Sequence, residues 1–214
     1  MGTDRLTDVL DATYTCLSRY GVRRTTVDDI AGEMGVSRSA VYQYVRGKDD
    51  AVRRLTRRLH DRALDRAAAA AASDAPPAER IHGILAAKLD LVLDLVGGSP
   101  HIAELLDAKA RLSGDICDAF TGRIRELLVE QFATDDAARV FPADAARARP
   151  TGPARVRPAD AADICLAVVI GLETHPEAAR LLPPAVDALL TGLLPAPAPA
   201  SAPAGPLPAA KPRS

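Results

Sequence analysis

The side chains best suited to recognition chemistry lie in one short segment, from Ser37 to Lys48. On a helical wheel the apolar residues of this segment gather on one side and the polar ones on the other. The outward side holds Ser39, Tyr42, Gln43 and Arg46, with Arg38 beside them. Guanidinium, amide and hydroxyl groups are those that hydrogen-bond base edges in the major groove of DNA. The pattern indicates a DNA-reading helix, although a solvated surface helix would show the same polarity.

Two residues near the ends of the predicted helix-turn-helix region suit contacts with a phosphate backbone. Thr26 stands at the start of a predicted helix, and Lys48 at the start of a longer one. A helix N-terminus offers backbone N–H groups to an anion, and Lys48 adds a charge. These residues would hold DNA without discriminating bases.

The elements around these residues form a predicted helix-turn-helix. Thr25 and Thr26 precede Asp28 and Asp29 at the spacing of a capping box. Gly35 allows a tight reversal, and the Ser37 hydroxyl can cap the next helix. Two short helices joined by a glycine turn are typical of this motif.

Signals for enzyme chemistry are missing from the sequence. The chain has no nucleophile elbow, phosphate-binding loop or GxGxxG, and no HxxxH pair. We therefore expect no enzyme, no metal and no cofactor. The three cysteines stand far apart, so a disulfide framework is not expected either. The scattered residues are His60, His82, His101 and His175, and Cys16, Cys117 and Cys165.

Composition predicts an all-α fold. Of 214 residues 42 are alanine, none is tryptophan, and only seven are aromatic, so few strand-forming residues remain. The net charge of −1 gives no general attraction to nucleic acid, but its distribution is uneven. Residues 1–58 carry 11 basic and 8 acidic side chains, whereas residues 59–214 carry 16 and 20. A positive N-terminal part permits a local nucleic-acid surface.

Prolines mark the boundaries between predicted helices, because proline breaks a helix interior. Residues 134–158 are expected to form a mobile loop, and residues 195–214 a disordered tail rich in proline and alanine. No apolar run is long enough to span a bilayer and no signal peptide is visible, so we expect a cytoplasmic protein without membrane contact. The predicted helices are Asp4–Tyr20, Val27–Met34, Arg38–Val45, Asp49–Ala72, Pro77–Val96, His101–Leu112, Asp115–Phe132, Ala159–Glu173 and Pro184–Leu194.

Residues 9–55 resemble the TetR family of bacterial transcription regulators over an ungapped stretch. One departure is Val45, where the family usually has phenylalanine. The matching residues are Val9, Ala12, Leu17, Gly21, Thr25, Thr26, Ile30, Ala31, Gly35, Val36, Ser37, Val41, Tyr42, Tyr44, Lys48 and Leu55.

The resemblance implies a ligand-responsive regulator, foremost a repressor, that binds a palindromic operator as a homodimer and is released by a small-molecule effector. A transcriptional activator of the same fold is the alternative, and a helical ligand-binding enzyme a remote one. We expect a helix-turn-helix DNA-binding domain at residues 4–62 and a helical effector-binding and dimerisation domain at residues 63–194. The expected DNA-binding residues are Thr26, Arg38, Ser39, Tyr42, Gln43, Tyr44, Arg46 and Lys48.

The effector pocket and the dimer interface are the least constrained expectations. The last two predicted helices resemble the family's dimerisation pair, with Val169 and Leu189 expected in the interface. Two ordinary core helices would show the same sequence pattern. Polar and aromatic residues between Pro77 and Phe132 are candidates for lining the pocket, although packing or surface roles also fit them. These candidates are His82, His101, Glu104, Arg111, Cys117, Phe120 and Arg125.

Overall fold

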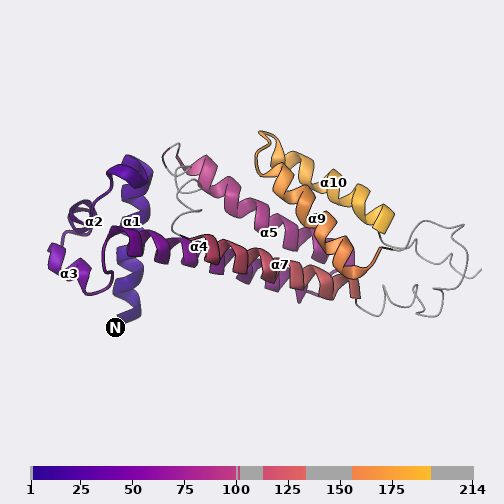
Figure 1. Cartoon of the computed structure of the whole chain (residues 1–214), viewed down its shortest axis with the longest axis horizontal. Helices are drawn as coiled ribbons and strands as arrows, with labels where there is room; N and C mark the ends of the chain where they lie inside the picture. Colours follow the sequence, from indigo (N-terminus) through magenta and orange to yellow (C-terminus); the bar gives the residue numbers. More distant parts are fainter. Residues whose placement is uncertain (1, 100, 102–112, 134–155, 194–214) are drawn as a thin grey trace, which may run out of the picture.

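The computed structural model describes residues 2–99, 101, 113–133 and 156–193, and within these ranges every regular element is an α-helix (Figure 1). The prediction of an all-α chain is therefore confirmed. The helices are α1 (Gly2–Arg24), α2 (Val27–Met34), α3 (Arg38–Tyr42), α4 (Lys48–Ala71), α5 (Pro77–Gly98), α7 (Gly114–Ala133), α9 (Pro158–Leu172) and α10 (Ala178–Leu193).

The molecule is elongated, and its buried apolar residues form two clusters. α1, α2 and α3 lie at one end, and α4 runs from them toward the other end, where α9 and α10 lie (Figure 1). The smaller cluster, here called the head cluster, consists of Val9, Ala12, Cys16, Val27, Ile30, Ala31, Val41, Val45 and Ala51. The larger one, the body cluster, draws on α1, α4, α5, α7, α9 and α10.

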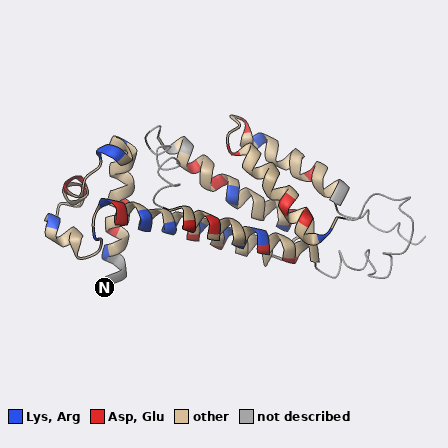
Figure 2. Ribbon diagram, in the orientation of Figure 1, with Lys and Arg blue, Asp and Glu red and all other residues tan. Residues whose placement is uncertain are grey.

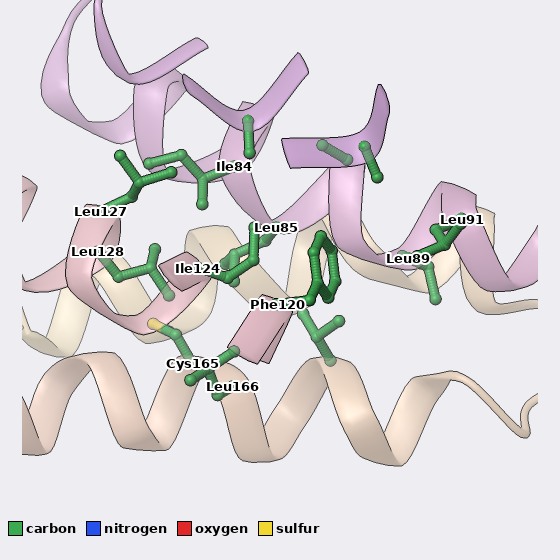
Figure 3. Packing of buried hydrophobic residues seen from close by; sticks show 14 of the residues in the cluster. Ile84, Leu85, Leu89, Leu91, Phe120, Ile124, Leu127, Leu128, Cys165 and Leu166 are labelled. Carbon is green, nitrogen blue, oxygen red and sulfur yellow. The ribbon is translucent and has the colours of Figure 1, made fainter. Parts of the chain in front are cut away.

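The body cluster is built where α5, α7 and α9 meet. Figure 3 shows Ile84, Leu85 and Leu89 of α5 beside Phe120, Ile124 and Leu128 of α7, with Cys165 and Leu166 of α9 closing the packing. Each of these side chains is less than a tenth exposed. Burial of such apolar surface is the main force that holds the helices together.

Most predicted helix boundaries agree with the structure to within two or three residues. α2 has the predicted bounds, because a capping box starts it and a left-handed glycine ends it. α1 runs on to Arg24, although Gly21 interrupts it with a φ of 77° close to the predicted end. α3 is shorter than predicted and ends at Tyr42, with turns continuing to Tyr44.

The predicted start of the last helix at Pro184 is wrong, because α10 begins at Ala178 and contains Pro183 and Pro184 in its second turn. The prediction took proline as a boundary between helices, because proline breaks a helix interior. Here the two prolines forgo bonds to the carbonyls four residues earlier, and both rings lie on the exposed side of the helix. Apart from His101, the predicted helix His101–Leu112 lies outside the described residues. The same holds for most of the predicted loop at residues 134–158 and for the predicted tail at residues 195–214.

None of the helices in the described ranges is both long and apolar enough to cross a membrane. All three cysteines are buried, and none of them forms a disulfide within the described ranges.

The crossing of α4 and α5 depends on a glycine. A Cβ atom on Gly83 would lie 2.7 Å from the Cβ atom of Ala70, far inside van der Waals contact. We expect Gly83→Ala to lower the free energy of unfolding by about 1–2 kcal/mol, because overpacking outweighs the gain in helix propensity. Urea unfolding at a fixed protein concentration measures this change.

Gly122 on α7 is the matched control, since a Cβ atom there would meet nothing within 4 Å. Gly122→Ala should raise the free energy of unfolding by about 0.5–1 kcal/mol. Equal stability of the two variants would show that α4 and α5 are less closely packed than the structure indicates.

Candidate nucleic-acid interface

α2 is fixed by the capping box that its sequence predicted. The Thr26 hydroxyl oxygen accepts a hydrogen bond from the Asp29 N–H at 3.2 Å, and the Thr26 N–H donates to Asp29 Oδ2 at 2.8 Å. The hydroxyl itself donates to the same carboxylate at 2.7 Å. Thr26 is exposed, but its side chain is fully engaged within the box. A phosphate contact by this hydroxyl therefore requires it to exchange one of these partners.

The turn between α2 and α3 sets the angle of the second helix. Gly35 has φ 64° and ψ 31°, a left-handed conformation that glycine adopts without strain. Its N–H and that of Val36 donate to carbonyls at the end of α2. The Ser37 hydroxyl then caps α3 by accepting from the Ala40 N–H at 3.3 Å. Val41 and Val45 are buried in the head cluster, so the opposite side of α3 faces outward.

The outward side of α3, which we call the recognition face, consists of Arg38, Ser39, Tyr42 and Gln43, all exposed. The Arg38 guanidinium donates to Tyr42 Oη at 3.1 Å and pairs with Asp28 at 3.1 Å. It also lies 5.4 Å from the centroid of the Tyr42 ring. The Tyr42 hydrogen bond, followed by the Asp28 charge, raises the pKa of Arg38 above its ordinary value. A preorganised cation therefore stands at the start of the face.

The remaining expected DNA-binding residues differ in their surroundings. Tyr44 is half-buried against the head cluster, whereas Arg46 is exposed. Lys48 Nζ donates to the Val22 and Arg23 carbonyls at 3.2 and 3.4 Å, so the ammonium group ties the end of α1 to the start of α4. An ammonium group has three donors, and two of them are used in this way.

Two exposed cations at the end of α1, Arg23 and Arg24, were not singled out from the sequence. They directly precede Thr25 and Thr26. A basic pair just before the start of a helix is the sequence signal by which they could have been selected. Basic residues on α3 and at the end of α1 lie at the end of the molecule away from α9 and α10 (Figure 2). Three of the first four arginines of α4, in contrast, form ion pairs within the protein: Arg53 with Asp115, Arg54 with Asp50, and Arg58 with Asp11.

The structure separates the expected effector residues rather than gathering them. Cys117 and Phe120 are buried on the side of α7 that faces α4, and His82 is half-buried on α5. His101 is exposed, and Arg125 forms a surface ion pair with Asp163. Glu104 and Arg111 lie outside the described residues. No group of three potential metal ligands occurs in the described part of the chain.

A cavity of about 210 Å³ lies between α4 and α7. It includes Phe120, one of the expected residues, and His60, which the sequence gave no reason to select. The full lining is Arg57, His60, Asp61, Leu64, Asp115, Ile116, Ala119 and Phe120. At its edge Asp115 forms a two-point ion pair with Arg53, with distances of 2.7 and 2.5 Å. The hydrogen bond from Arg53 lowers the pKa of Asp115 to about 2.

Comparison with known proteins agrees with the helix-turn-helix geometry. Residues 9–55 match the sequence profile of bacterial regulatory proteins of the TetR family. The helix-turn-helix segment of this chain is therefore of the TetR family type. Regulators of the TetR family are DNA-binding proteins without enzymatic activity, as the absence of catalytic motifs had led us to expect. No curated protein sequence shows a significant match to this chain.

Solved structures share the fold at low sequence identity. A TetR/AcrR family regulator from Thermobifida fusca is 22% identical, with a TM-score of 0.66 over 88% of this chain and 98% of that one. NalD from Pseudomonas aeruginosa, the secondary repressor of the MexAB-OprM multidrug efflux pump, is 20% identical, with a TM-score of 0.55 over 91% and 98%. A complex of SmeT with triclosan is 20% identical, with a TM-score of 0.63 over 95% and 99%. These likenesses show that the fold is shared over most of the chain.

Proposed function

We propose that this chain is a regulator of the TetR type, a repressor that binds a two-fold-symmetric operator as a homodimer and is released by a small-molecule effector. The observation that carries the proposal is the recognition face, with four exposed polar side chains on a helix fixed from behind by Val41 and Val45. In this reading two copies of α3 enter successive major grooves, roughly 34–36 Å apart. We propose residues 4–62 as the DNA-binding domain and residues 63–194 as the effector-binding and dimerisation domain.

Within the interface we propose separate roles for reading and holding. Arg38, Ser39 and Gln43 read base edges, because guanidinium, hydroxyl and amide groups match the donors and acceptors there. Thr26, Tyr42 and Lys48 hold phosphates, as do Arg23 and Arg24 beside them. Arg46, exposed just beyond α3, is a further contact of this kind. Tyr44 supports the interface from its half-buried position instead.

An exposed apolar face supports a dimer through α9 and α10. Ile164 and Ile170 on α9 are 38% and 48% exposed, large values for isoleucine. Leu189 on α10 is half-buried and contacts the body cluster at its edge. Val169, which we had expected in the interface, is completely buried within the subunit. The proposed interface therefore uses the Ile164 side of α9.

The cavity between α4 and α7 is the place we propose for an effector. It combines apolar walls with a few charged groups, as small-molecule sites usually do. One structural neighbour, SmeT, is seen in complex with triclosan. α4 lines the cavity and also carries Lys48 at the DNA end. An effector that prefers another position of α4 would thus reduce operator affinity, through its different affinities for the two states.

The distinction between reading and holding is testable with two substitutions. Gln43→Ala should cost roughly 1–3 kcal/mol on the operator and relax preference at one base position. Lys48→Ala should weaken binding to operator and random DNA alike, and lower the salt slope by about one per subunit. The operator is first obtained by selecting duplexes from a random pool with the purified protein. Titration at several salt concentrations then compares the selected and scrambled duplexes.

Because Lys48 also ties α1 to α4, its variant needs a check of folding. Urea unfolding supplies that check, and Arg46→Gln is a second phosphate variant that leaves this tie intact. Intact base preference in Gln43→Ala, together with altered preference in Lys48→Ala, would overturn the proposed orientation of α3. Transcription from a reporter carrying the selected duplex should fall when the protein is supplied; a rise would show an activator.

A further inference from the structure

Cys117 of α7 and His60 of α4 meet at the junction of their helices. Cys117 Sγ lies 3.5 Å from His60 Nε2, within hydrogen-bond distance for sulfur. His60 is 5% exposed and Cys117 9% exposed. The two residues are 57 positions apart, so only the packing of α4 on α7 brings them together.

The second contact of His60 indicates which of its ring nitrogens carries the proton. His60 Nδ1 lies 2.8 Å from the carbonyl oxygen of Thr56. A carbonyl can only accept, so Nδ1 carries the proton and donates it. In the neutral ring the lone pair is then on Nε2, directed at the Cys117 thiol. Phe120 fixes the ring edge-on, with the ring centroids 5.0 Å apart and an angle of 88° between the planes.

This arrangement resembles an activated nucleophile in its chemistry. A thiol beside a base, with the base oriented by a third group, is the general pattern for nucleophilic side chains. The reactive form of cysteine is the thiolate, which a neighbouring imidazole favours. His60 and Phe120 also line the 210 Å³ cavity, so a small molecule that enters it comes close to the pair.

The other two cysteines provide internal controls. Cys16 is 1% exposed and Cys165 is completely buried. Burial raises the pKa of each thiol to about 11, and no histidine contributes to either value. Both should be inert at neutral pH in the folded protein.

We propose that Cys117 is a nucleophilic thiol activated by His60, and that small carbon electrophiles such as α,β-unsaturated carbonyl compounds alkylate it from the cavity. The thiol proton passes to His60 Nε2, and the thiolate forms a carbon–sulfur bond at the β-carbon. The π electrons of the double bond move to the α-carbon, which takes the proton from His60. The addition needs no oxidant and releases no leaving group.

A consequence for DNA binding rests on the proposed function. An adduct on Cys117 would displace His60 and thereby change the packing of α4 on α7. The Arg53–Asp115 ion pair at the cavity edge joins α4 to α7, and α4 also carries Lys48 at the DNA end. Alkylation should therefore lower operator affinity, which makes electrophiles the effector class that this site senses.

N-ethylmaleimide, a small α,β-unsaturated carbonyl compound, tests the reactivity directly. The folded full-length protein is treated with less than one equivalent, and mass spectrometry of its peptides locates the label. Cys117 should react at least about tenfold faster than Cys16 and Cys165. In guanidinium chloride the three rates should become similar. Equal or slower labelling of Cys117 in the folded protein would overturn the proposal.

A second arm isolates His60 and the effect on DNA. His60→Gln should slow labelling of Cys117 about tenfold, and an unchanged rate in a folded variant would exclude the base. Labelled protein should bind the selected duplex about tenfold more weakly, whereas treated Cys117→Ser should bind it normally. Unchanged binding by labelled protein would exclude sensing. If no duplex can be selected at all, the proposed DNA function fails, and the labelling rates still decide the reactivity of Cys117.

Discussion

Glu173→Ala should lower the free energy of unfolding by about 3 kcal/mol, the largest loss we expect from one surface-proximal carboxylate. Glu173 Oε1 lies 2.5 Å from Lys88 Nζ, and the Lys88 side chain is only 7% exposed. Removing the carboxylate leaves a buried ammonium without its counter-charge between α5 and the end of α9. The penalty comes from that stranded charge rather than from the strength of the pair itself. Urea unfolding at fixed protein concentration measures it.

Two comparisons separate this explanation from a general effect of the position. Glu177, a few residues further on, pairs with Arg180, and both side chains are more than half exposed. Glu177→Ala should therefore cost less than about 1 kcal/mol. Adding Lys88→Met to Glu173→Ala should restore most of the lost stability, since no buried charge remains. A double variant no more stable than Glu173→Ala would refute the stranded-charge explanation.

Ile164→Asp should convert the proposed dimer into monomers. A charge placed at the centre of an apolar interface is desolvated on association without a partner, which disfavours the dimer. The mass measured by light scattering should fall to that of one chain, 22.5 kDa. Operator affinity should fall by about a hundredfold or more, because the two half-sites are no longer bound by linked modules.

The control for this variant is Tyr20→Asp, which places the same charge on a residue that is 45% exposed on α1. It should remain a dimer. Ile164 faces away from the subunit core, so Ile164→Asp should stay folded, whereas Val169→Asp should unfold the subunit itself. If Ile164→Asp and Ile170→Asp both remain dimers, the interface lies elsewhere on the molecule.

Local signals explain what could be predicted from the sequence. The bounds of α2 follow from Thr26, Asp29 and Gly35, all within ten residues of one another. The outward face of α3 follows from helical periodicity, and the structure exposes Gln43 and buries Val41 accordingly. Such features depend on neighbours along the chain, which a sequence displays directly.

Contacts between distant residues could not be predicted in the same way. Lys88 and Glu173 are 85 positions apart, and Lys48 and Val22 are 26 apart. In the sequence His60 is one of four scattered histidines, and only the packing of α4 on α7 brings it to Cys117. The start of α10 was missed for another reason: proline was taken to mark a boundary between helices, although the apolar pattern continues upstream of Pro183.

Neighbouring residues of α1 and α4 belong to different hydrophobic clusters, and this limits how the protein can be divided. Val9 faces the head cluster and Leu10 the body cluster, and Ala51 and Val52 divide in the same manner. A fragment ending before α4 would expose Leu10, Leu17 and Val22 to water. Chimaeric regulators that exchange recognition helices should therefore be joined within α4. The residues of the body cluster that contact α1 should be transferred together with α1. A recombinant chain that separated α1 from its contacts on α4 would have an incomplete head cluster and an incomplete body cluster.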